Sequence, residues 1–486
     1  MGVLGSLSPA LVWEYFEEIC KIPRFSKHEE KIREYLLKFA GLHALSSFED
    51  KVGNILIIRP ASPGYENKKT VVLQSHMDMV GENRAGFSHN WLTDSVIPYI
   101  DNGWVRTNGT TLGADDGIGM AAAMAVLTDK YLKTGPIECL FTVDEETGMT
   151  GALNLNPGFF SGRTLINLDS EDEGILFIGC AGGMDTQATL KYEPVFVTEG
   201  MKAYEIKLTG LHGGHSGDEI HKGYGNAVKI MTMLLSDLAL VYNIDISIFN
   251  GGNIRNAIPR EATALIVTEP CKAGYITERI IKYASEVTSK LAVLEPDIRI
   301  SVNEVTVPGT VIDRVTRDKL LDALTDCPHG VISWSKEMED LVETSSNLAS
   351  VKFEEGNIIR IVTTQRSSDE TAKSEIGERV RTCFASRGAE VRSSDGYPAW
   401  KPDLSSEILQ ITRKSYLRLF GKDAEVKAIH AGLECGLIYE KDNEIDMISF
   451  GPTIKGAHTP EEMIEIESVN RFWKLLTDVL QNIPAI

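Results

Sequence analysis

A short apolar run that ends in two metal-capable side chains is the strongest constraint on the fold of this chain. Residues 71–75 read Val-Val-Leu-Gln-Ser and lead directly into His76 and Asp78. A run of this kind predicts a buried strand, because a strand with one face in water would alternate apolar and polar residues. His76 and Asp78 are two positions apart, so both side chains leave the end of the strand on the same side.

Polar side chains also follow other predicted strands. They are Glu145 and Glu146 after the strand expected at 137–143, Asp169 after the strand at 164–168, and His458 in a loop after the strand at 446–450. In open α/β sheets, ligands gather beyond the carboxyl ends of the strands. The sequence therefore predicts an α/β sheet with these side chains converging at one edge.

Simpler interpretations fit each motif when it is taken alone. Asp115 and Asp116 stand where a glycine-rich loop meets an Ala- and Met-rich helix, a position at which carboxylates cap free N–H groups. His76 and Asp78 fit a hydrogen-bonded structural pair. The acids at 144–146 fit a solvated turn, although adjacent carboxylates repel one another unless a cation faces them.

Composition narrows the class of protein. A chain of 486 residues exceeds the usual size of one core, which predicts more than one domain. The formal charge of −20 argues against a nucleic-acid partner.

No apolar run approaches ~18 residues and the first residues lack signal-peptide features, so we expect a cytoplasmic protein without a membrane partner. Seven scattered cysteines without CxxC spacing suit reduced thiols.

The pattern of the chain changes after a glycine-rich stretch at 179–183. Alternating strands and amphipathic helices follow as far as about residue 398, and this is typical of a separate α+β domain. After that point the earlier α/β pattern returns. We therefore predict a catalytic domain at 1–183 and 399–486 that is interrupted by a domain at 184–398.

Two local patterns predict where helices begin. Ser26 and Glu29 have the spacing of a capping box ahead of an apolar helical stripe at 32–39. Pro460, followed by Glu461 and Glu462, predicts the start of the final helix and leaves His458 on the loop before it.

Four of the strand-end residues together with Asp115 form a set of two histidines and three carboxylates, namely His76, Asp115, Glu146, Asp169 and His458. One carboxylate that bridges two divalent ions, with a histidine and a further carboxylate on each ion, would use all five. Three carboxylates would also balance much of the charge of two zinc ions.

The motifs occur in a recognisable order. They are His76-x-Asp78, Gly113-Ala114-Asp115-Asp116-Gly117, Asp144-Glu145-Glu146-Thr147-Gly148, Leu168-Asp169-Ser170-Glu171 and Gly456-Ala457-His458-Thr459-Pro460-Glu461-Glu462. The series resembles the co-catalytic di-zinc peptidases related to carboxypeptidase G and peptidase T, and among them the cytosolic nonspecific, or aminoacyl-histidine, dipeptidases. The resemblance covers nearly the whole chain. It implies a mixed-sheet α/β zinc-peptidase domain interrupted by an inserted α+β lid domain.

The resemblance also implies roles for the set. Asp115 would bridge two Zn²⁺ ions per chain, with manganese or cobalt as alternatives. His76 and Asp169 would hold one ion, and Glu146 and His458 the other. Asp78 would orient His76, and Glu145 would be the general base for attack by a zinc-bridging hydroxide.

Further residues come from the inserted domain. The resemblance implies that His215 polarises the oxyanion and that Asn256 and Arg366 hold the substrate's C-terminal carboxylate. A glycine-rich turn, a turn asparagine and a surface arginine are the simpler alternatives for these three residues. The roles of His430 and Glu434 stay open.

The implied activity is hydrolysis of unblocked dipeptides, including Xaa-His dipeptides, by a homodimer. Alternatives within the same group of enzymes are a tripeptide aminopeptidase, a carboxypeptidase and an N-acyl amino acid deacylase. A metal-bearing binding protein without turnover is the alternative from another class.

Overall fold

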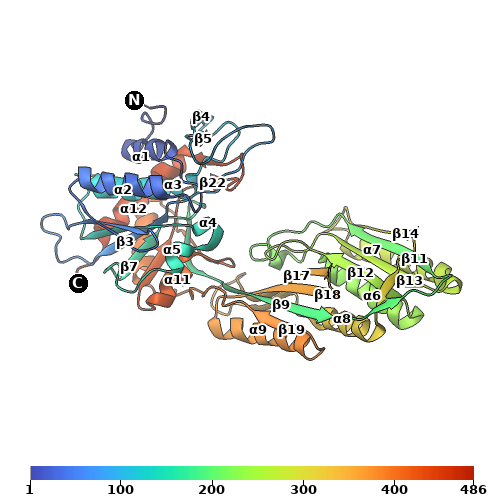
Figure 1. The fold of residues 1–486 in the computed structure, drawn as a ribbon. Helices are drawn as coiled ribbons and strands as arrows, with labels where there is room; N and C mark the ends of the chain where they lie inside the picture. The colour runs from blue at the N-terminus through green and yellow to red at the C-terminus, as the bar shows by residue number, and fades with distance from the viewer. Residues whose placement is uncertain (1) are drawn as a thin grey trace. The chain divides into compact units, whose positions relative to one another are not determined.

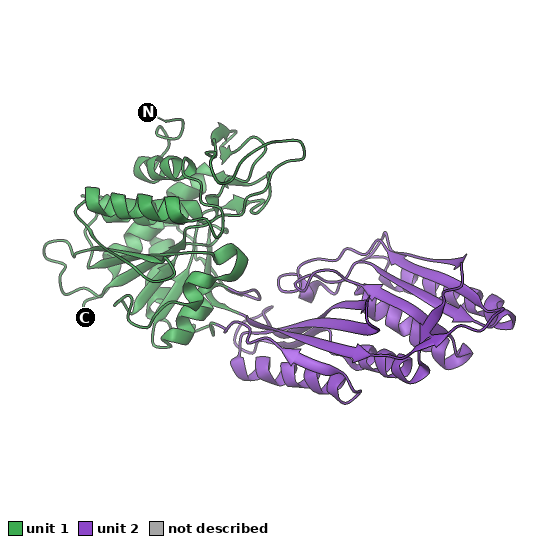
Figure 2. Ribbon diagram, in the orientation of Figure 1, with its two compact units in different colours: residues 1–180, 400–428, 433–486 green, residues 181–399, 429–432 purple. Residues whose placement is uncertain are grey.

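The computed structural model describes residues 2–486, which form two compact units (Figure 2). Unit 1 comprises the chain up to Cys180 together with Trp400–Ala428 and Leu433–Ile486. Unit 2 comprises Ala181–Ala399 and the short segment Ile429–Gly432. Within residues 2–486, no helix is both long enough and apolar enough to cross a membrane.

An eight-stranded mixed sheet is the centre of unit 1 (Figure 1). Its strands, in spatial order, are β1 (Ser46–Glu49), β2 (Ile55–Arg59), β6 (Ile137–Thr142), β3 (Val71–His76), β7 (Thr164–Asn167), β21 (Asp446–Ser449), β8 (Ile175–Cys180) and β20 (Glu425–Ile429). Strand β3 pairs in parallel with both β6 and β7, and β7 pairs in parallel with β21. The carboxyl ends of these four strands therefore lie at the same edge of the sheet.

Helices and a smaller sheet complete unit 1. The helices are α1 (Ala10–Cys20), α2 (Glu30–Leu42), α3 (Ala114–Thr128), α4 (Glu145–Gly148), α5 (Thr150–Leu153), α10 (Glu407–Phe420), α11 (Glu434–Lys441) and α12 (Ile466–Asn482). The small sheet has the order β22 (Ile454–Lys455), β23 (Met463–Glu465), β5 (Trp104–Arg106) and β4 (Tyr99–Asp101). Helix α3 is buried from Ala114 to Leu127, because its alanines and glycines let it pack closely between α1 and strand β3.

Unit 2 is an antiparallel sheet with helices. The main path of the sheet is β14 (Arg299–Val305), β11 (Lys202–Thr209), β13 (Ala262–Thr268), β12 (Asp245–Gly251), β17 (Val342–Glu354), β18 (Ile358–Ser367), β9 (Gly182–Lys191) and β19 (Glu390–Ser393), with β16 (Gly330–Trp334) paired to β17. The helices are α6 (Ala227–Tyr242), α7 (Ala273–Leu291), α8 (Arg314–Asp326) and α9 (Glu370–Ala385), with 3-10 turns η1 (Ile220–Lys222) and η2 (Pro270–Lys272). A two-stranded ribbon joins β10 (Pro194–Phe196) to β15 (Thr310–Ile312). The largest cluster of buried apolar residues in this unit joins the sheet to its helices, and two smaller clusters accompany it.

The two helix starts predicted from local patterns are wrong. Helix α2 begins at Glu30, and the Glu29 side chain does not cap it. The Ser26 hydroxyl instead donates to the Asp78 carboxylate at 2.8 Å. The last helix begins at Ile466 rather than at Pro460, because residues 456–462 form a compact turn between β22 and β23.

Candidate metal centre

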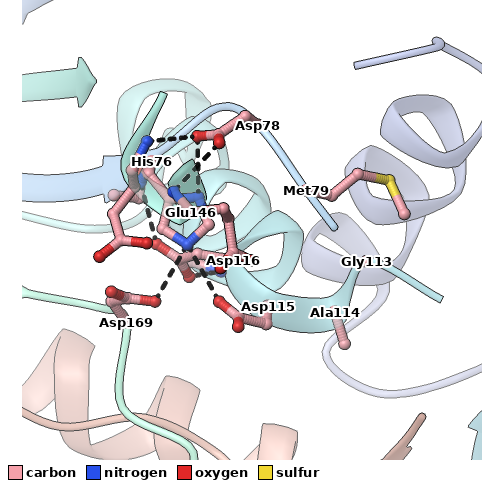
Figure 3. A network of polar contacts seen from close by, with 12 residues as sticks. His76, Asp78, Met79, Gly113, Ala114, Asp115, Asp116, Glu146 and Asp169 are labelled. Atoms are coloured by element: carbon pink, nitrogen blue, oxygen red, sulfur yellow. Dashed lines mark hydrogen bonds and ion pairs between the residues drawn. The ribbon is translucent and has the colours of Figure 1, made fainter. Parts of the chain in front are cut away.

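The parallel strands deliver polar side chains to one edge of the unit 1 sheet (Figure 3). Strand β3 ends at His76, and Asp78 follows directly. Strand β6 leads into the short helix α4, which carries Glu145 and Glu146, and strand β7 leads into Asp169.

His76 faces carboxylates with both of its ring nitrogens. Its Nε2 atom lies 3.0 Å from Asp115 Oδ1 and 3.3 Å from Asp169 Oδ1. Its Nδ1 atom lies 3.4 Å from Asp78 Oδ1. The imidazole is buried, so these carboxylates define its orientation. A histidine whose second nitrogen faces a carboxylate is the usual arrangement for a metal ligand.

Asp115 contacts a second histidine with its other oxygen. His458 Nε2 lies 3.0 Å from Asp115 Oδ2 and 3.0 Å from Glu146 Oε2. Two groups of potential ligands therefore share Asp115. His76, Asp115 and Asp169 form one group, and Asp115, Glu146 and His458 form the other, with the ligand atoms of each group within 4.8 Å of one another.

The backbone around Asp115 explains how two adjacent aspartates serve different purposes. Gly113 has a left-handed φ of 69°, and neither Asp115 nor Asp116 has helical dihedral angles. Asp116 accepts hydrogen bonds from the Gly119 amide at 3.1 Å and from the His76 amide at 3.2 Å. Asp116 therefore caps the regular part of α3, as the simpler interpretation expected, whereas Asp115 points at the two histidines.

Asp78 connects the end of β3 with helix α4. Its Oδ1 atom accepts the Glu145 amide at 3.0 Å, and its Oδ2 atom accepts the Glu146 amide at 3.2 Å. The Glu146 side chain is only 5% exposed, so the acids of this turn are not solvated. Glu146 Oε1 is buried and has no hydrogen-bond partner among residues 2–486.

The charges of the cluster are unbalanced in the protein alone. Burial raises the pKa of Asp169 to about 7 and that of Glu171 to about 8, and it raises the pKa of Glu145 well above its usual value. Hydrogen bonds to Asp115 and Glu146 raise the pKa of His458 to about 11. Cations would compensate the charge of these clustered carboxylates, and imidazole and carboxylate donors suit divalent transition metals.

Unit 2 brings together two of its predicted substrate residues. Asn256 and Arg366 line a cavity of about 310 Å³ together with Arg255, Thr364 and Tyr397. Arg366 Nη1 donates to the Tyr397 hydroxyl at 2.7 Å, and Arg366 Nε is buried with no hydrogen-bond partner among the described residues. A guanidinium with an unused buried donor suits a carboxylate ligand.

The remaining predicted residues also have defined surroundings. His215 Nδ1 lies 3.1 Å from Asp218 Oδ2, and the His215 backbone pairs with Ala257, next to Asn256. His430 Nε2 lies 2.8 Å from the Ser345 hydroxyl within unit 2.

Three further buried charged residues contact the segments that carry the predicted set. Glu434 accepts hydrogen bonds from Gln74 and Thr142, both at 2.7 Å, in unit 1. Arg24 and Glu462 contact the backbone that leads to Asp115. No sequence motif pointed to Arg24, and Glu462 was predicted only as part of the start of the final helix. Only the position of Glu462 inside the His458 motif pointed to it.

A family model described as peptidase family M20/M25/M40 matches residues 72–482. The chain belongs to peptidase family M20/M25/M40. The membership expected from the motif series is therefore confirmed, and so is the mixed α/β fold.

Individual known proteins match this chain over nearly its full length. The chain is 41% identical over 485 residues to the cytosol non-specific dipeptidase of Escherichia coli (strain K12), and the match covers 100% of both chains. The crystal structure of aminoacylhistidine dipeptidase from Vibrio alginolyticus superposes with a TM-score of 0.92 at 40% identity, covering 99% of this chain and 98% of that one. Aminopeptidase PepT from Bacillus cereus ATCC 10987 shares the fold, with a TM-score of 0.63 at 16% identity over 98% of this chain and 99% of that one.

Proposed function

We propose that this M20/M25/M40 peptidase is a metallodipeptidase that hydrolyses unblocked dipeptides, including Xaa-His dipeptides. One observation carries the proposal: the two oxygens of Asp115 each lie 3.0 Å from the Nε2 atom of a different histidine, His76 or His458. A carboxylate in this position would bridge two cations, one beside each histidine. The 41% sequence identity to a dipeptidase over the full length of the chain supports the choice of substrate.

The metal ligands follow from the two groups that share Asp115. His76 and Asp169 would hold one ion, and Glu146 and His458 would hold the other. Zinc is the proposed metal, with manganese and cobalt as alternatives, because nitrogen and oxygen donors suit all three. When bound, a pair of such ions lowers the pKa of water and polarises the carbonyl that is to be cleaved.

Glu145 is the proposed general base. Its amide is fixed by Asp78, and the next residue, Glu146, is a proposed ligand, so the Glu145 carboxylate is held beside the metal centre. Burial raises its pKa well above the usual value, which suits a group that accepts a proton from the attacking water and passes it to the leaving amine.

Unit 2 is proposed as the lid. Arg366 would bind the C-terminal carboxylate of the dipeptide through its unused donors, and Asn256 in the same cavity would add a hydrogen bond. His215 would donate from Nε2 to the oxyanion, while its Nδ1 atom stays beside Asp218. We also propose that the enzyme is cytoplasmic and that it is a homodimer; measurement of its mass in solution would test the homodimer.

A substrate panel combined with metal analysis tests the function. The purified protein is assayed with Xaa-His and other dipeptides, tripeptides and N-acetyl amino acids, and metal per chain is measured in the same samples. We expect chelator-sensitive cleavage of dipeptides and two ions per chain. Faster cleavage of tripeptides or N-acetyl amino acids would favour a tripeptide aminopeptidase, a carboxypeptidase or a deacylase. Bound metal without turnover would favour a binding protein.

A further inference from the structure

Glu462 is a buried carboxylate whose hydrogen-bond partners are four consecutive backbone amides. Its side chain accepts from Leu112 at 2.7 Å, Gly113 at 2.8 Å, Ala114 at 2.7 Å and Asp115 at 3.3 Å. Glu462 is 2% exposed, so water does not replace these contacts. Buried backbone amides need hydrogen-bond partners, and the Glu462 carboxylate supplies them for this segment, which precedes the regular part of α3.

Glu462 belongs to the same turn as His458. The Thr459 amide donates to the Gly456 carbonyl at 3.2 Å, and the Glu462 amide donates to the Thr459 carbonyl at 3.1 Å. His458 and Gly456 both have left-handed φ angles, of 63° and 67°, which fold the segment tightly. This single turn therefore meets Asp115 twice: His458 contacts its carboxylate, and Glu462 contacts its backbone amide.

The Arg24 side chain contacts the same segment by donating a hydrogen bond to one of the segment's backbone carbonyl groups. The buried guanidinium donates to the Gly113 carbonyl and, at 2.5 Å, to the Asp78 carbonyl. It also donates to the Met77 carbonyl at 3.0 Å. The segment 112–115 is thus joined to the end of strand β3 by Arg24 and to the His458 turn by Glu462. Figure 3 shows Gly113, Ala114 and Asp115 leading into the centre.

We propose that Glu462 is a positioning residue that holds the backbone of Asp115 in place before any metal ion binds. The inference rests on the proposed metal centre, in which Asp115 is the bridging ligand. Asp115 lies outside regular helix, so helical hydrogen bonds do not fix its main chain. Without the Glu462 carboxylate, metal binding would have to order this segment, and the apparent affinity would fall accordingly.

A cap that only stabilises the fold would behave differently. It would lower the stability of the protein when removed, yet the folded protein would bind metal as before. A positioning residue changes the affinity of the folded protein, and partners behind metal ligands typically alter that affinity about 10- to 100-fold. Metal affinity and local amide exchange therefore separate the two roles.

The test compares Glu462→Gln with Glu461→Gln. Glu461 is the neighbouring acid, and its side chain is 60% exposed and pairs with Arg84, so it is a matched control. Metal-free wild-type and variant proteins are titrated with Zn²⁺ to obtain dissociation constants. Hydrogen exchange of amides 112–115 is measured in the same metal-free proteins.

For Glu462→Gln we expect Zn²⁺ to bind about 10- to 100-fold more weakly and amides 112–115 to exchange faster, while the rest of α3 is unchanged. Glu461→Gln should match the wild type in both measurements. Wild-type affinity in Glu462→Gln would overturn the inference, even if exchange were faster, because the residue would then be only a cap. Unchanged exchange would overturn it as well.

A second variant and the wild-type metal content make the test conclusive. If Glu462→Gln does not fold, Glu462→Asp keeps the charge but shortens the side chain, and the same two measurements apply to it. A wild-type protein that bound no pair of ions would refute the proposed metal centre, whereas amide exchange in the metal-free protein would still report on Glu462. A wild-type protein that binds two ions, with variants of equal affinity, would refute only the role of Glu462.

Discussion

His458 Nε2 lies 3.0 Å from Asp115 Oδ2, although 343 positions separate the two residues along the chain. Asp115 comes from the start of α3, and His458 comes from the turn between β22 and β23. Because the other oxygen of Asp115 faces His76, this carboxylate is common to both groups of potential ligands. The first prediction follows from that position.

Asp115→Asn should abolish binding of both ions, whereas Asp169→Asn should weaken binding of one. An amide has a single acceptor oxygen and no charge, so it cannot replace a bridging carboxylate. Metal per chain, measured after equilibration with a limiting concentration of Zn²⁺, checks this difference. Asp172→Asn, at an exposed position close by, is the control and should keep the wild-type metal content. Two ions retained by Asp115→Asn would refute the bridging role.

Glu145→Gln should lower kcat about 10²–10⁴-fold and leave the metal content unchanged. The amide keeps the size of the side chain but cannot accept the proton of the attacking water. Steady-state assays on an Xaa-His dipeptide, combined with metal analysis, check the prediction. Glu146→Gln is the informative comparison, because it should lose metal as well as activity. An unchanged rate in Glu145→Gln would exclude it as the base.

The elements around this centre could be predicted where burial alone decides the structure. Strands β3 and β6 are buried at every position, and a strand with no solvent-facing side leaves a largely apolar run in the sequence, here interrupted only by residues such as Gln74 and Glu138. The expected ranges for β6 and β7, 137–143 and 164–168, therefore exceed the observed strands by only one residue. The strand ends then placed His76, Glu146 and Asp169 near one edge.

Arg366→Lys should raise KM for dipeptides about 10- to 100-fold while the metal content stays constant. Lysine keeps the charge but cannot present the planar pair of donors that binds a carboxylate. The discriminating measurement compares a dipeptide with its C-terminal amide: the wild type should prefer the free carboxylate, and the variant should lose that preference. Arg360→Lys, on the same strand and paired with Glu354, is the matched control.

Acidification should destabilise the protein through His329 in unit 2. Burial lowers its pKa from 6.5 to about 4, so between these values the unfolded chain binds a proton that the folded protein does not. The stabilisation is complete above pH 6.5 and is lost as the pH falls towards 4. Between pH 6.5 and 5 the loss from this residue is on the order of 2 kcal/mol.

Denaturant unfolding at several pH values checks this effect. The free energy of unfolding of His329→Gln should depend less steeply on pH than that of the wild type in this window. His221→Gln, at an exposed position, should keep the wild-type slope. An identical slope for His329→Gln and the wild type would show that the folded protein protonates His329 normally.

Two side chains show why local patterns misled the helix predictions. Ser26 and Glu29 have the spacing of a capping box, but the Ser26 hydroxyl is used by Asp78, which lies 52 positions away. Glu462 fits the first turn of a helix after Pro460, yet its carboxylate is committed to amides about 350 positions earlier in the chain, such as that of Leu112. Local propensity carries no information on partners so distant, so the final helix was placed too early.

The late position of His458 has a consequence for synthesis of the protein. A ribosome that has translated as far as residue 457 has already made His76, Asp115, Glu146 and Asp169, and also every strand of the large sheet of unit 1. The nascent chain then has the donors for one cation but lacks the histidine for the other, and it also lacks Glu462. A chain released before this point would contain every strand of that sheet and would still lack a proposed ligand of the second cation, together with helix α12.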